Sequence, residues 1–205
     1  RHTMSPNIHN YLAELLGHNL IYLPFEVKSD VHAAVRGAYA LGIVGMNVTV
    51  PYKSAVLEDL KAIDPIAKNI GAVNTLVRTD GGYKGYNTDI LGLKRELQSE
   101  GISLAGEEVI LLGAGGAARA TAFLCADEGA KSILILNRDF EKAEQLAGEI
   151  NHLLAKEETY VQAVCQEDFL KLPGQDYIAF QCTPVGLSPN VDAAAIETEE
   201  FYQKL

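Results

Sequence analysis

The feature that most constrains the fold of this chain is a glycine-rich turn between a short apolar run and an alanine-rich segment. Residues 108–112 read EVILL and residues 113–118 read GAGGAA, so the glycines follow a predicted strand and open a predicted helix. The spacing fits G-x-G-x-x-G/A, with Ala118 in the third position. Gly113 permits a tight turn, Gly115 lets the backbone approach a bound group, and Ala118 lets the helix pack closely on the strand. This unit predicts a parallel α/β sheet.

The start of the predicted helix is suited to the pyrophosphate group of a dinucleotide. Free amide groups at a helix N-terminus point toward such an anion, and the helix dipole favours it. The alternative, a glycine-rich turn that packs without a ligand, is disfavoured by the strand before the turn and the helix after it. The residues expected to bind the cofactor here are Gly113, Ala114, Gly115, Gly116, Ala117 and Ala118.

The end of the next predicted strand bears on which dinucleotide is bound. An NAD site normally places an acidic residue about 20 residues after the glycine turn, where it binds the ribose hydroxyls. Here Asn137 and Arg138 hold that place. A guanidinium group suits a 2′-phosphate, which favours NADP over NAD. Asp139 either holds a ribose hydroxyl, which would favour NAD, or serves only as the N-cap of the following helix.

Strands and helices alternate through the second half of the chain, in the order of a doubly wound parallel sheet. The expected strands are residues 108–112, 132–136, 159–163 and 177–181. The expected helices follow the glycine turn, span residues 140–155 and come after Gln166. Helices that connect parallel strands cover both faces of such a sheet. We therefore expect a Rossmann-type dinucleotide-binding domain over residues 90–205.

The first half predicts a separate α/β domain over residues 1–89, with a mostly parallel sheet. Its expected strands are residues 19–27 and 43–50, followed by a hairpin of residues 72–78 and 82–86 around Thr79-Asp80-Gly81. Its expected helices run from Ser5, as N-cap, to about Leu16, from Ser29-Asp30 to Gly42, and from Pro51 toward Leu60. A polar helix over residues 89–101 forms a bridge, which places the domain boundary near residues 89–105.

Composition and charge exclude several classes of function. The formal net charge of −10 argues against a protein that wraps nucleic acid or lies on an anionic membrane. No apolar run approaches the roughly 20 residues that a membrane span needs. Three cysteines at wide spacing indicate buried thiols in a reducing compartment, and no metal site is expected. We expect a cytoplasmic protein that binds small molecules, as a monomer or a homodimer.

A lysine near the end of a predicted strand is the candidate for acid–base chemistry. Residues 47–53 read NVTVPYK, and the strand ends at the proline. Asn47, Thr49 and Lys53 therefore lie near one strand end, where open sheets bind ligands. Hydride transfer to or from an alcohol carbon requires a group that holds the proton of the oxygen, and a lysine can do so. Taken singly, an exposed surface lysine is the simpler interpretation.

Taken together, the motifs of the chain resemble those of the shikimate dehydrogenase family, which includes enzymes that oxidise quinate. They occur in the family's order and approximate spacing over nearly the whole chain. The combination of NVTVPYK, GAVNT and NTD is the specific part, because the glycine turn alone would fit many dehydrogenases. The motifs are HTMSP at 2–6, NVTVPYK at 47–53, GAVNTL at 71–76, GYNTD at 85–89, GAGGAA at 113–118, NR at 137–138 and TPVG at 183–186.

The resemblance implies an oxidoreductase of chorismate and aromatic amino-acid biosynthesis, which reversibly reduces 3-dehydroshikimate to shikimate with NADPH. It implies that Lys53 and Asp89 form the catalytic pair, and that Thr183 and Gly186 lie beside the nicotinamide. Considered alone, Ser5 is better explained as a helix cap, and Asn74 as an amide that bonds a turn or the backbone. The residues that the resemblance assigns to the substrate are Thr3, Ser5, Asn47, Thr49, Asn74 and Thr88.

Departures from the family pattern leave two alternatives open. The family usually has serine where Thr3 stands and threonine where Asp139 stands, so a quinate/shikimate dehydrogenase that uses NAD is the first alternative. A catalytically silent dinucleotide-binding module is the second, although such a module would not need both Lys53 and Asp89. The family's leading strand and its C-terminal return to the substrate domain have no counterpart in this sequence. We therefore expect the natural protein to extend further.

Overall fold

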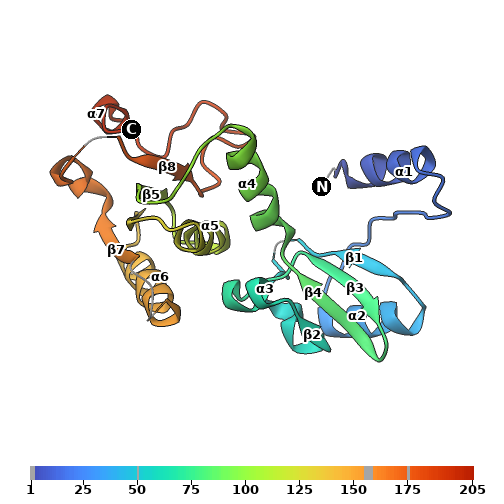
Figure 1. The fold of residues 1–205 in the computed structure, drawn as a ribbon. Coiled ribbons are helices and arrows are strands. Elements are labelled where there is room, and N and C mark those ends of the chain that lie inside the picture. Colours follow the sequence, from blue (N-terminus) through green and yellow to red (C-terminus); the bar gives the residue numbers. More distant parts are fainter. Residues whose placement is uncertain (1–2, 50, 155–158, 175) are drawn as a thin grey trace.

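The computed structural model describes residues 3–49, 51–154, 159–174 and 176–205, which form two four-stranded sheets with helices packed beside them (Figure 1). The elements of the first half are α1 (Ser5–Leu15), α2 (Val31–Ala40), β1 (Gly45–Asn47), the 3₁₀ helix η1 (Ala55–Asp59), β2 (Ala62–Ile63), α3 (Pro65–Ile70), β3 (Thr75–Thr79), β4 (Gly82–Tyr86) and α4 (Thr88–Ser99). Those of the second half are β5 (Glu108–Leu112), α5 (Gly116–Asp127), β6 (Ser132–Asn137), α6 (Phe140–Leu153), β7 (Tyr160–Cys165), the 3₁₀ helix η2 (Gln166–Lys171), β8 (Ile178–Gln181) and α7 (Glu199–Tyr202).

The second sheet confirms the predicted parallel arrangement. Its strands lie in the order β7-β6-β5-β8, and every neighbouring pair is parallel. The central strand β5 is buried on both sides. Val109 and Leu111 pack into a core with helices α5 and α6, while Ile110 and Leu112 pack into a second core that includes Phe169 of η2. Continuous apolar runs of this kind are typical of parallel strands that are covered on both faces.

The first sheet is mixed, so the expected mostly parallel sheet is wrong for this half. Its strands lie in the order β1-β3-β4-β2, and only β2 and β4 are parallel. The hairpin at Thr79-Asp80-Gly81 forms as predicted, and a hairpin makes β3 and β4 antiparallel. Strand β1 pairs with the other edge of β3, also antiparallel. The register places Thr75 between Asn47 on one side and Tyr86 on the other.

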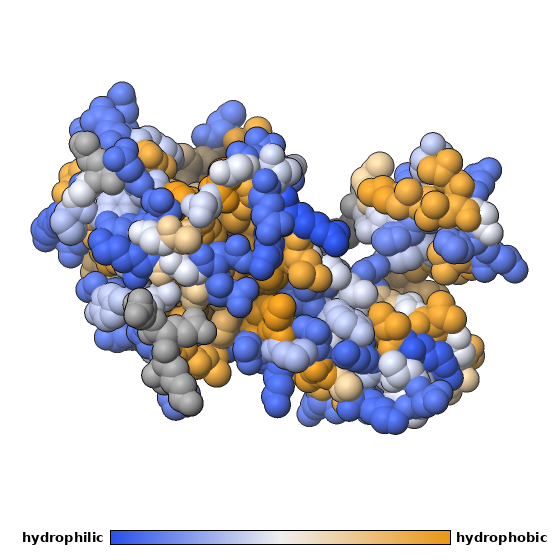
Figure 2. Space-filling view, viewed as in Figure 1, coloured by the Kyte–Doolittle hydropathy of each residue, from blue (hydrophilic) through white to orange (hydrophobic). Residues whose placement is uncertain are grey.

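The predicted strand over residues 19–27 is wrong, because this segment finds no partner strand among the described residues. The amide of the Asn10 side chain bonds both the N–H and the C=O of Tyr22 instead. Apolar side chains of the segment stay exposed, with Ile21 72% and Phe25 75% accessible. Figure 2 shows further apolar side chains gathered on the lobe that contains α1, where Ile8 and Leu15 are exposed.

The helix predicted from Pro51 toward Leu60 is replaced by turns and the short helix η1. The carbonyl of Lys53 accepts a hydrogen bond from the backbone N–H of Val73, and the N–H of Leu57, which would bond it in an α-helix, donates to the carbonyl of Ser54 instead. The strand predicted over residues 43–50 is shortened to β1, and Val50 lies outside the described residues. The predicted end of the 140–155 helix, Ala155, also lies outside them.

The start of α1 differs from the prediction by one residue. Met4 holds the N-cap position and Ser5 is the first helical residue, so Ser5 is not the cap. The hydroxyl of Thr3 accepts the Ser5 N–H instead. By contrast, Asp30 caps α2 as predicted, because its carboxylate accepts the N–H of Ala33.

Three short elements, α3, β2 and α7, were not predicted, although the sequence carries a signal for α3. Helix α3 begins with the Asp64 cap and Pro65, and it ends at Gly71, whose φ is 70°. These are ordinary start and stop signals. Strand β2 has only two residues, too few for alternation of apolar and polar side chains to be visible. Within the described ranges, no helix combines the length and the apolarity needed to cross a bilayer.

Candidate functional site

The side chains of Lys53 and Asp89 form an ion pair, although they are 36 residues apart in the sequence. The Lys53 Nζ donates to Asp89 Oδ2 over 2.7 Å. Both side chains are partly exposed, 30% for the lysine and 55% for the aspartate, so a ligand can reach them from solvent. The arrangement can hold or release a proton at a bound hydroxyl group.

The position of Asp89 is set by the first turn of α4. Asn87 caps this helix, and its Oδ1 accepts the backbone N–H of Asp89 at 3.1 Å. The other end of the Asn87 amide donates to the carbonyl of Ala72 at 3.1 Å, and the side chain is buried. A carboxylate in a first helical turn is also favoured by the helix dipole. The asparagine therefore ties the helix start to the segment between α3 and β3.

The position of Lys53 is set by the same part of the first sheet. Its carbonyl accepts the N–H of Val73 at 2.9 Å, and the next residue, Asn74, donates its N–H to the carbonyl of Tyr86. These bonds bring the turn after β1 beside the start of β3 and the end of β4. Lys53 and the start of α4 thus both lie near Asn74.

Asn74 lies at the centre of the site and is only 9% exposed. Its Nδ2 donates to Asp89 Oδ1 over 2.8 Å, which leaves Asp89 Oδ2 for Lys53. Its Oδ1 accepts the hydroxyl of Thr75 at 3.0 Å and both the N–H and the hydroxyl of Thr88 at 3.0 and 3.1 Å. Asn74 and Thr88, both assigned to the substrate by resemblance, therefore meet at the Lys53–Asp89 pair.

Asn47 joins the same network from the end of β1. Its Nδ2 donates to the hydroxyl of Thr75 at 3.2 Å, and its Oδ1 accepts the hydroxyl of Tyr22 at 3.1 Å. Thr49, two residues further on, is exposed, and its carbonyl accepts the N–H of Tyr52. Within the described ranges, the hydroxyl of Thr49 makes no hydrogen bond to the pair.

Thr3 and Ser5 lie at the start of α1 and bond each other. The hydroxyl of Thr3 donates to the hydroxyl of Ser5 at 3.2 Å. In the part of the chain that the structure describes, neither side chain bonds Lys53, Asp89 or Asn74. Helix α1 instead reaches the site through Tyr22, which Asn10 holds by two hydrogen bonds. The expected substrate role of Thr3 and Ser5 remains a prediction.

The glycine turn has the geometry that its sequence predicts. Gly113 has φ +111°, and a Cβ built on it would lie 2.8 Å from Cγ2 of Thr183. A side chain is therefore excluded there by both conformation and space. At Gly115 and Gly116, a Cβ would meet nothing within 4 Å. Open space lies in front of the first amides of α5, which have no partners within the helix, so a pyrophosphate group fits.

Helix α5 begins at Gly116, so Ala117 and Ala118 lie in its first turn. Ala118 is fully buried in the core beneath the sheet, as the close packing of helix and strand requires. Ala114, between the first two glycines, is half-buried and packs against the same core. The three alanines therefore shape the turn, and Gly115 and Gly116 form its open side.

The end of β6 holds Asn137, Arg138 and Asp139. The Asn137 amide donates to the carbonyl of Asp139 at 2.8 Å, and Arg138 is exposed, with no hydrogen bond or ion pair among the described residues. Asp139 caps α6 by accepting the N–H of Lys142 and forms an ion pair with its ammonium group at 2.9 Å. The hydrogen bond from the Lys142 side chain is the main reason why the pKa of Asp139 lies below its usual value.

The loop after β8 contains two further predicted residues, Thr183 and Gly186. Thr183 contacts Gly113, as described, and its hydroxyl donates to Gln181 Oε1 at 2.9 Å. Gly186 has φ +84°, and a Cβ there would lie 3.1 Å from the carbonyl oxygen of Ala193. Thr183 therefore lies beside the glycine turn.

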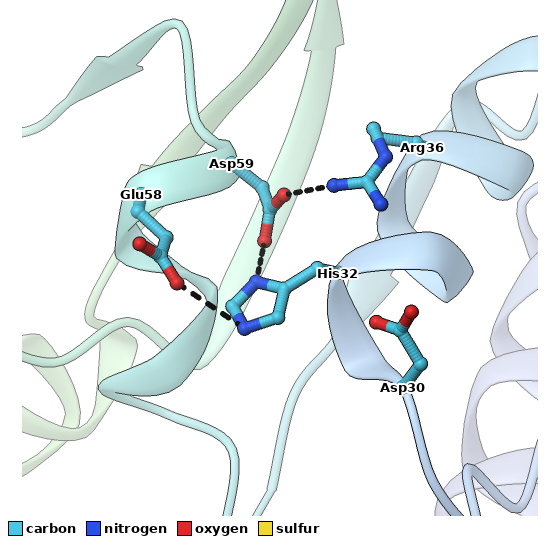
Figure 3. A pocket seen from close by; sticks show the side chains of 5 residues that line it. All are labelled: Asp30, His32, Arg36, Glu58 and Asp59. Carbon is cyan, nitrogen blue, oxygen red and sulfur yellow. Dashed lines mark hydrogen bonds and ion pairs between the residues drawn. The ribbon is translucent and has the colours of Figure 1, made fainter.

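A pocket of about 450 Å³ was not predicted, and it shares no residue with these clusters. It lies between α2 and η1 and is lined by Asp30, His32, Arg36, Glu58 and Asp59 (Figure 3). His32 Nδ1 lies 2.6 Å from Asp59 Oδ2, and Arg36 lies 3.2 Å from Asp59 Oδ1. His32, Arg36, Glu58 and Asp59 thus bond one another, and these bonds tie α2 to η1.

Three residues of the site itself were missed. Thr75 and Asn87 lie inside the motifs GAVNTL and GYNTD, and this placement was the available signal. Tyr22 carried no motif signal, because its role depends on a contact with Asn47, 25 residues away.

Two family models match the chain. One is described as the shikimate dehydrogenase substrate binding domain and matches residues 1–76. The other is described as shikimate / quinate 5-dehydrogenase and matches residues 95–168. The first match includes β1 and β2 and ends within β3, and the second includes β5, β6 and β7.

Curated proteins and solved structures resemble the chain over most of its length. It is 38% identical to a shikimate dehydrogenase (NADP(+)) of Halothermothrix orenii, covering 97% of this chain and 70% of that protein. It is 50% identical to a shikimate dehydrogenase (NADP(+)) of Moorella thermoacetica over 72% of this chain, which spans half of that protein's length.

Among solved structures, shikimate 5-dehydrogenase of Listeria monocytogenes, in complex with shikimate and NAD, matches with a TM-score of 0.87 and 33% identity, covering 98% of this chain and 71% of that one. Shikimate 5-dehydrogenase of Thermus thermophilus, in complex with NADP(H) and shikimate, matches with a TM-score of 0.80 and 30% identity, covering 97% and 70%.

Proposed function

Because the chain belongs to the shikimate dehydrogenase family, we propose that the protein containing it interconverts shikimate and 3-dehydroshikimate with NADP as cofactor. The observation that carries the proposal is the Lys53–Asp89 ion pair, with Asn74 bonded to the second oxygen of the carboxylate. A catalytically silent module would have no need for this arrangement. Several curated relatives carry the same activity in their names.

The reaction removes a hydride from an alcohol carbon and a proton from its oxygen. Bound NADP supplies the acceptor for the hydride. Lys53 lies where it can contact the reacting hydroxyl group and assist the transfer of its proton, while Asp89 holds and orients the ammonium group. In the reverse direction the pair returns the proton to the forming alcohol. General acid–base assistance of this kind contributes about 100- to 10,000-fold to a rate.

The other polar groups of the site bind and orient the substrate in this proposal. Nδ2 of Asn74 uses one hydrogen on Asp89 and keeps a second for a ring hydroxyl. Asn47, Thr49 and Thr88 add further polar groups near this end of the sheet. Thr3 and Ser5 bind the carboxylate of the substrate, since hydroxyls at a helix start supply donors where the dipole favours an anion.

The cofactor residues favour NADP for a reason of charge. The Asp139 carboxylate is already bonded by Lys142 and by the helix start, which weakens its repulsion of a 2′-phosphate. Arg138 has an exposed guanidinium group that can bind this phosphate bidentately. Gly115 and Gly116 would hold the pyrophosphate, and Thr183 and Gly186 would contact the nicotinamide. Residues 1–89 bind the substrate and residues 90–205 the cofactor.

We also propose a cytoplasmic protein, since Cys125, Cys165 and Cys182 are free thiols. The test of the function is a rate measurement on the full-length protein, followed by the absorbance of the reduced nicotinamide. Shikimate and quinate are each combined with NADP and with NAD. We expect the highest kcat/KM for shikimate with NADP. A large preference for quinate with NAD, or no turnover with any pair, would contradict the proposal.

A further inference from the structure

We propose that Thr75 is a positioning residue, whose hydroxyl group fixes the direction in which the Asn74 amide faces the Asp89 carboxylate. The inference rests on the proposed function, because it assigns the Lys53–Asp89 pair to the reaction and Asn74 to the substrate. Thr75 itself contacts neither member of the pair in the structure. It acts through Asn74.

The backbone register places Thr75 where it can do this. It is the first residue of β3, with Asn47 directly opposite on β1 and Tyr86 directly opposite on β4. Side chains of residues paired across neighbouring strands point to the same face of the sheet. The Thr75 hydroxyl therefore meets the Asn47 amide across the ladder, at 3.2 Å, and the side chain of its own neighbour Asn74 at 3.0 Å.

The direction of each hydrogen bond follows from the donors available. An ionised carboxylate only accepts hydrogen bonds, so Asn74 must present its NH₂ group to Asp89 and its carbonyl to the opposite side. That carbonyl accepts the single proton of the Thr75 hydroxyl. The hydroxyl oxygen is then free to accept a hydrogen from the NH₂ group of Asn47. One hydroxyl thus serves both asparagines, as donor to the first and as acceptor from the second.

The far end of this network is held by Tyr22. Its hydroxyl donates to the Asn47 carbonyl oxygen at 3.1 Å, so the NH₂ group of Asn47 points toward Thr75. Tyr22 is itself fixed by the Asn10 amide and by the ring of His9, which stacks on it with centroids 4.4 Å apart. The hydrogen bonds run without interruption from helix α1 to the carboxylate of Asp89.

The expected effect of losing this hydroxyl is moderate, because Asn74 keeps two donors from Thr88. Without the Thr75 hydroxyl the Asn74 side-chain carbonyl is held by Thr88 alone, and the Asn47 NH₂ group keeps only its longer hydrogen bond to the Asn74 backbone carbonyl, at 3.5 Å. An amide that rotates would turn its oxygen toward the carboxylate, where it repels, and would withdraw its free N–H from the substrate. We expect kcat/KM for shikimate to fall about tenfold, the value of one hydrogen bond.

The test compares three variants of the full-length protein. Thr75→Val keeps the shape of the side chain and removes the hydroxyl, while Thr75→Ser keeps the hydroxyl and removes the methyl group. Thr79→Val is the matched control, because Thr79 lies on the same strand and, among the described residues, its hydroxyl bonds only the carbonyl of Gly82, at the hairpin turn. Rates are measured with varied shikimate and with varied NADP, and nitrogen-edited NMR follows the side-chain amide signals of Asn47 and Asn74.

The inference requires four results. Thr75→Val lowers kcat/KM for shikimate about tenfold, but changes the KM for NADP less than about twofold, since the glycine turn is untouched. Thr75→Ser restores the rate, and Thr79→Val leaves it unchanged. Both asparagine amide signals shift in Thr75→Val and return in Thr75→Ser. Equal losses in the valine and serine variants, or in Thr79→Val, would overturn the inference.

The NMR measurement separates this inference from the proposed function. If the wild-type protein does not oxidise shikimate, the proposed function fails, but the amide signals still decide whether Thr75 holds Asn47 and Asn74. If the wild-type protein is active and the Thr75→Val amide signals and rates are unchanged, the positioning role of Thr75 is wrong and the proposed function stands.

Discussion

Gly113 and Thr183 lie so close together that a Cβ on the glycine would approach Cγ2 of the threonine to 2.8 Å. The contact joins the end of β5 to the loop after β8, and the φ of +111° adds a conformational cost for any other residue. We expect Gly113→Ala to destabilise the protein by about 2–4 kcal/mol through strain and overpacking. Urea denaturation of both proteins checks this value, and an unchanged midpoint would contradict it.

Gly115 gives the contrasting case, because a Cβ there meets no atom within 4 Å and its backbone is extended. We expect Gly115→Ala to change the free energy of unfolding by less than about 1 kcal/mol, the scale of an N-cap effect. The added methyl group would instead occupy the space proposed for the pyrophosphate. The dissociation constant for NADP should rise at least tenfold, which corresponds to a loss of about 1.4 kcal/mol in the free energy of binding. Calorimetric titration measures this constant. Unchanged affinity would place the pyrophosphate elsewhere.

Removal of the Lys53 ammonium group should abolish most turnover while leaving the cofactor site intact. For Lys53→Ala we expect kcat with shikimate to fall by about 100-fold or more, the contribution of acid–base assistance. The affinity for NADP should not change. Lys68→Ala, which removes an exposed lysine of α3, is the control and should keep the wild-type rate. Comparable kcat values for wild type and Lys53→Ala would remove Lys53 from the reaction.

Arg138 is expected to decide between the two dinucleotides. In Arg138→Ala, the loss of a charge-assisted contact to the 2′-phosphate should raise the KM for NADP about tenfold. The KM for NAD, which lacks this phosphate, should change little. Steady-state rates with both cofactors measure the ratio. Equal changes in the KM values for NADP and NAD would show that Arg138 does not recognise the 2′-phosphate.

The cluster at His32 predicts a dependence of stability on pH. The hydrogen bond to Asp59 raises the pKa of His32 above its usual 6.5, with Glu58 and Asp30 adding negative charge nearby. A raised folded-state pKa means that the stabilisation is complete below about pH 6.5 and is lost as the pH rises through the folded-state pKa. The difference in urea midpoint between wild type and His32→Gln should therefore shrink from pH 6 to pH 8. A constant difference would contradict this assignment.

The parallel sheet could be predicted from the sequence because each of its strands is indicated by a local run of apolar residues. Residues 108–112 and the glycine turn specify their own conformation, and β5 begins and ends where predicted. The Lys53–Asp89 pair was expected only from resemblance, since nothing local relates two residues that far apart. The strand predicted over residues 19–27 was wrong because its formation depends on a distant partner. These residues are apolar and β-branched, but a strand needs a partner, and none of the described residues supplies one.

The contacts that orient the site were invisible in the sequence because they depend on register. Thr75 bonds Asn47 only because these two residues stand opposite each other in the β1–β3 ladder. A shift by one residue would send the threonine to the other face of the sheet. Taken alone, Asn74 was better explained as a turn or backbone-pairing amide, and its burial beside Asp89 is what favours the site instead.

The asparagine and the aspartate at the centre of the site also differ from the lysine in how they come together during folding. Asn74 and Asp89 flank a single hairpin, 15 residues apart, whereas the lysine is 36 residues from its partner. Loop closure becomes more costly by about 0.6 kcal/mol for each doubling of length. We therefore expect the contact between Asn74 and Asp89 to form first, together with the local hairpin, and the contact between Lys53 and Asp89 to form later.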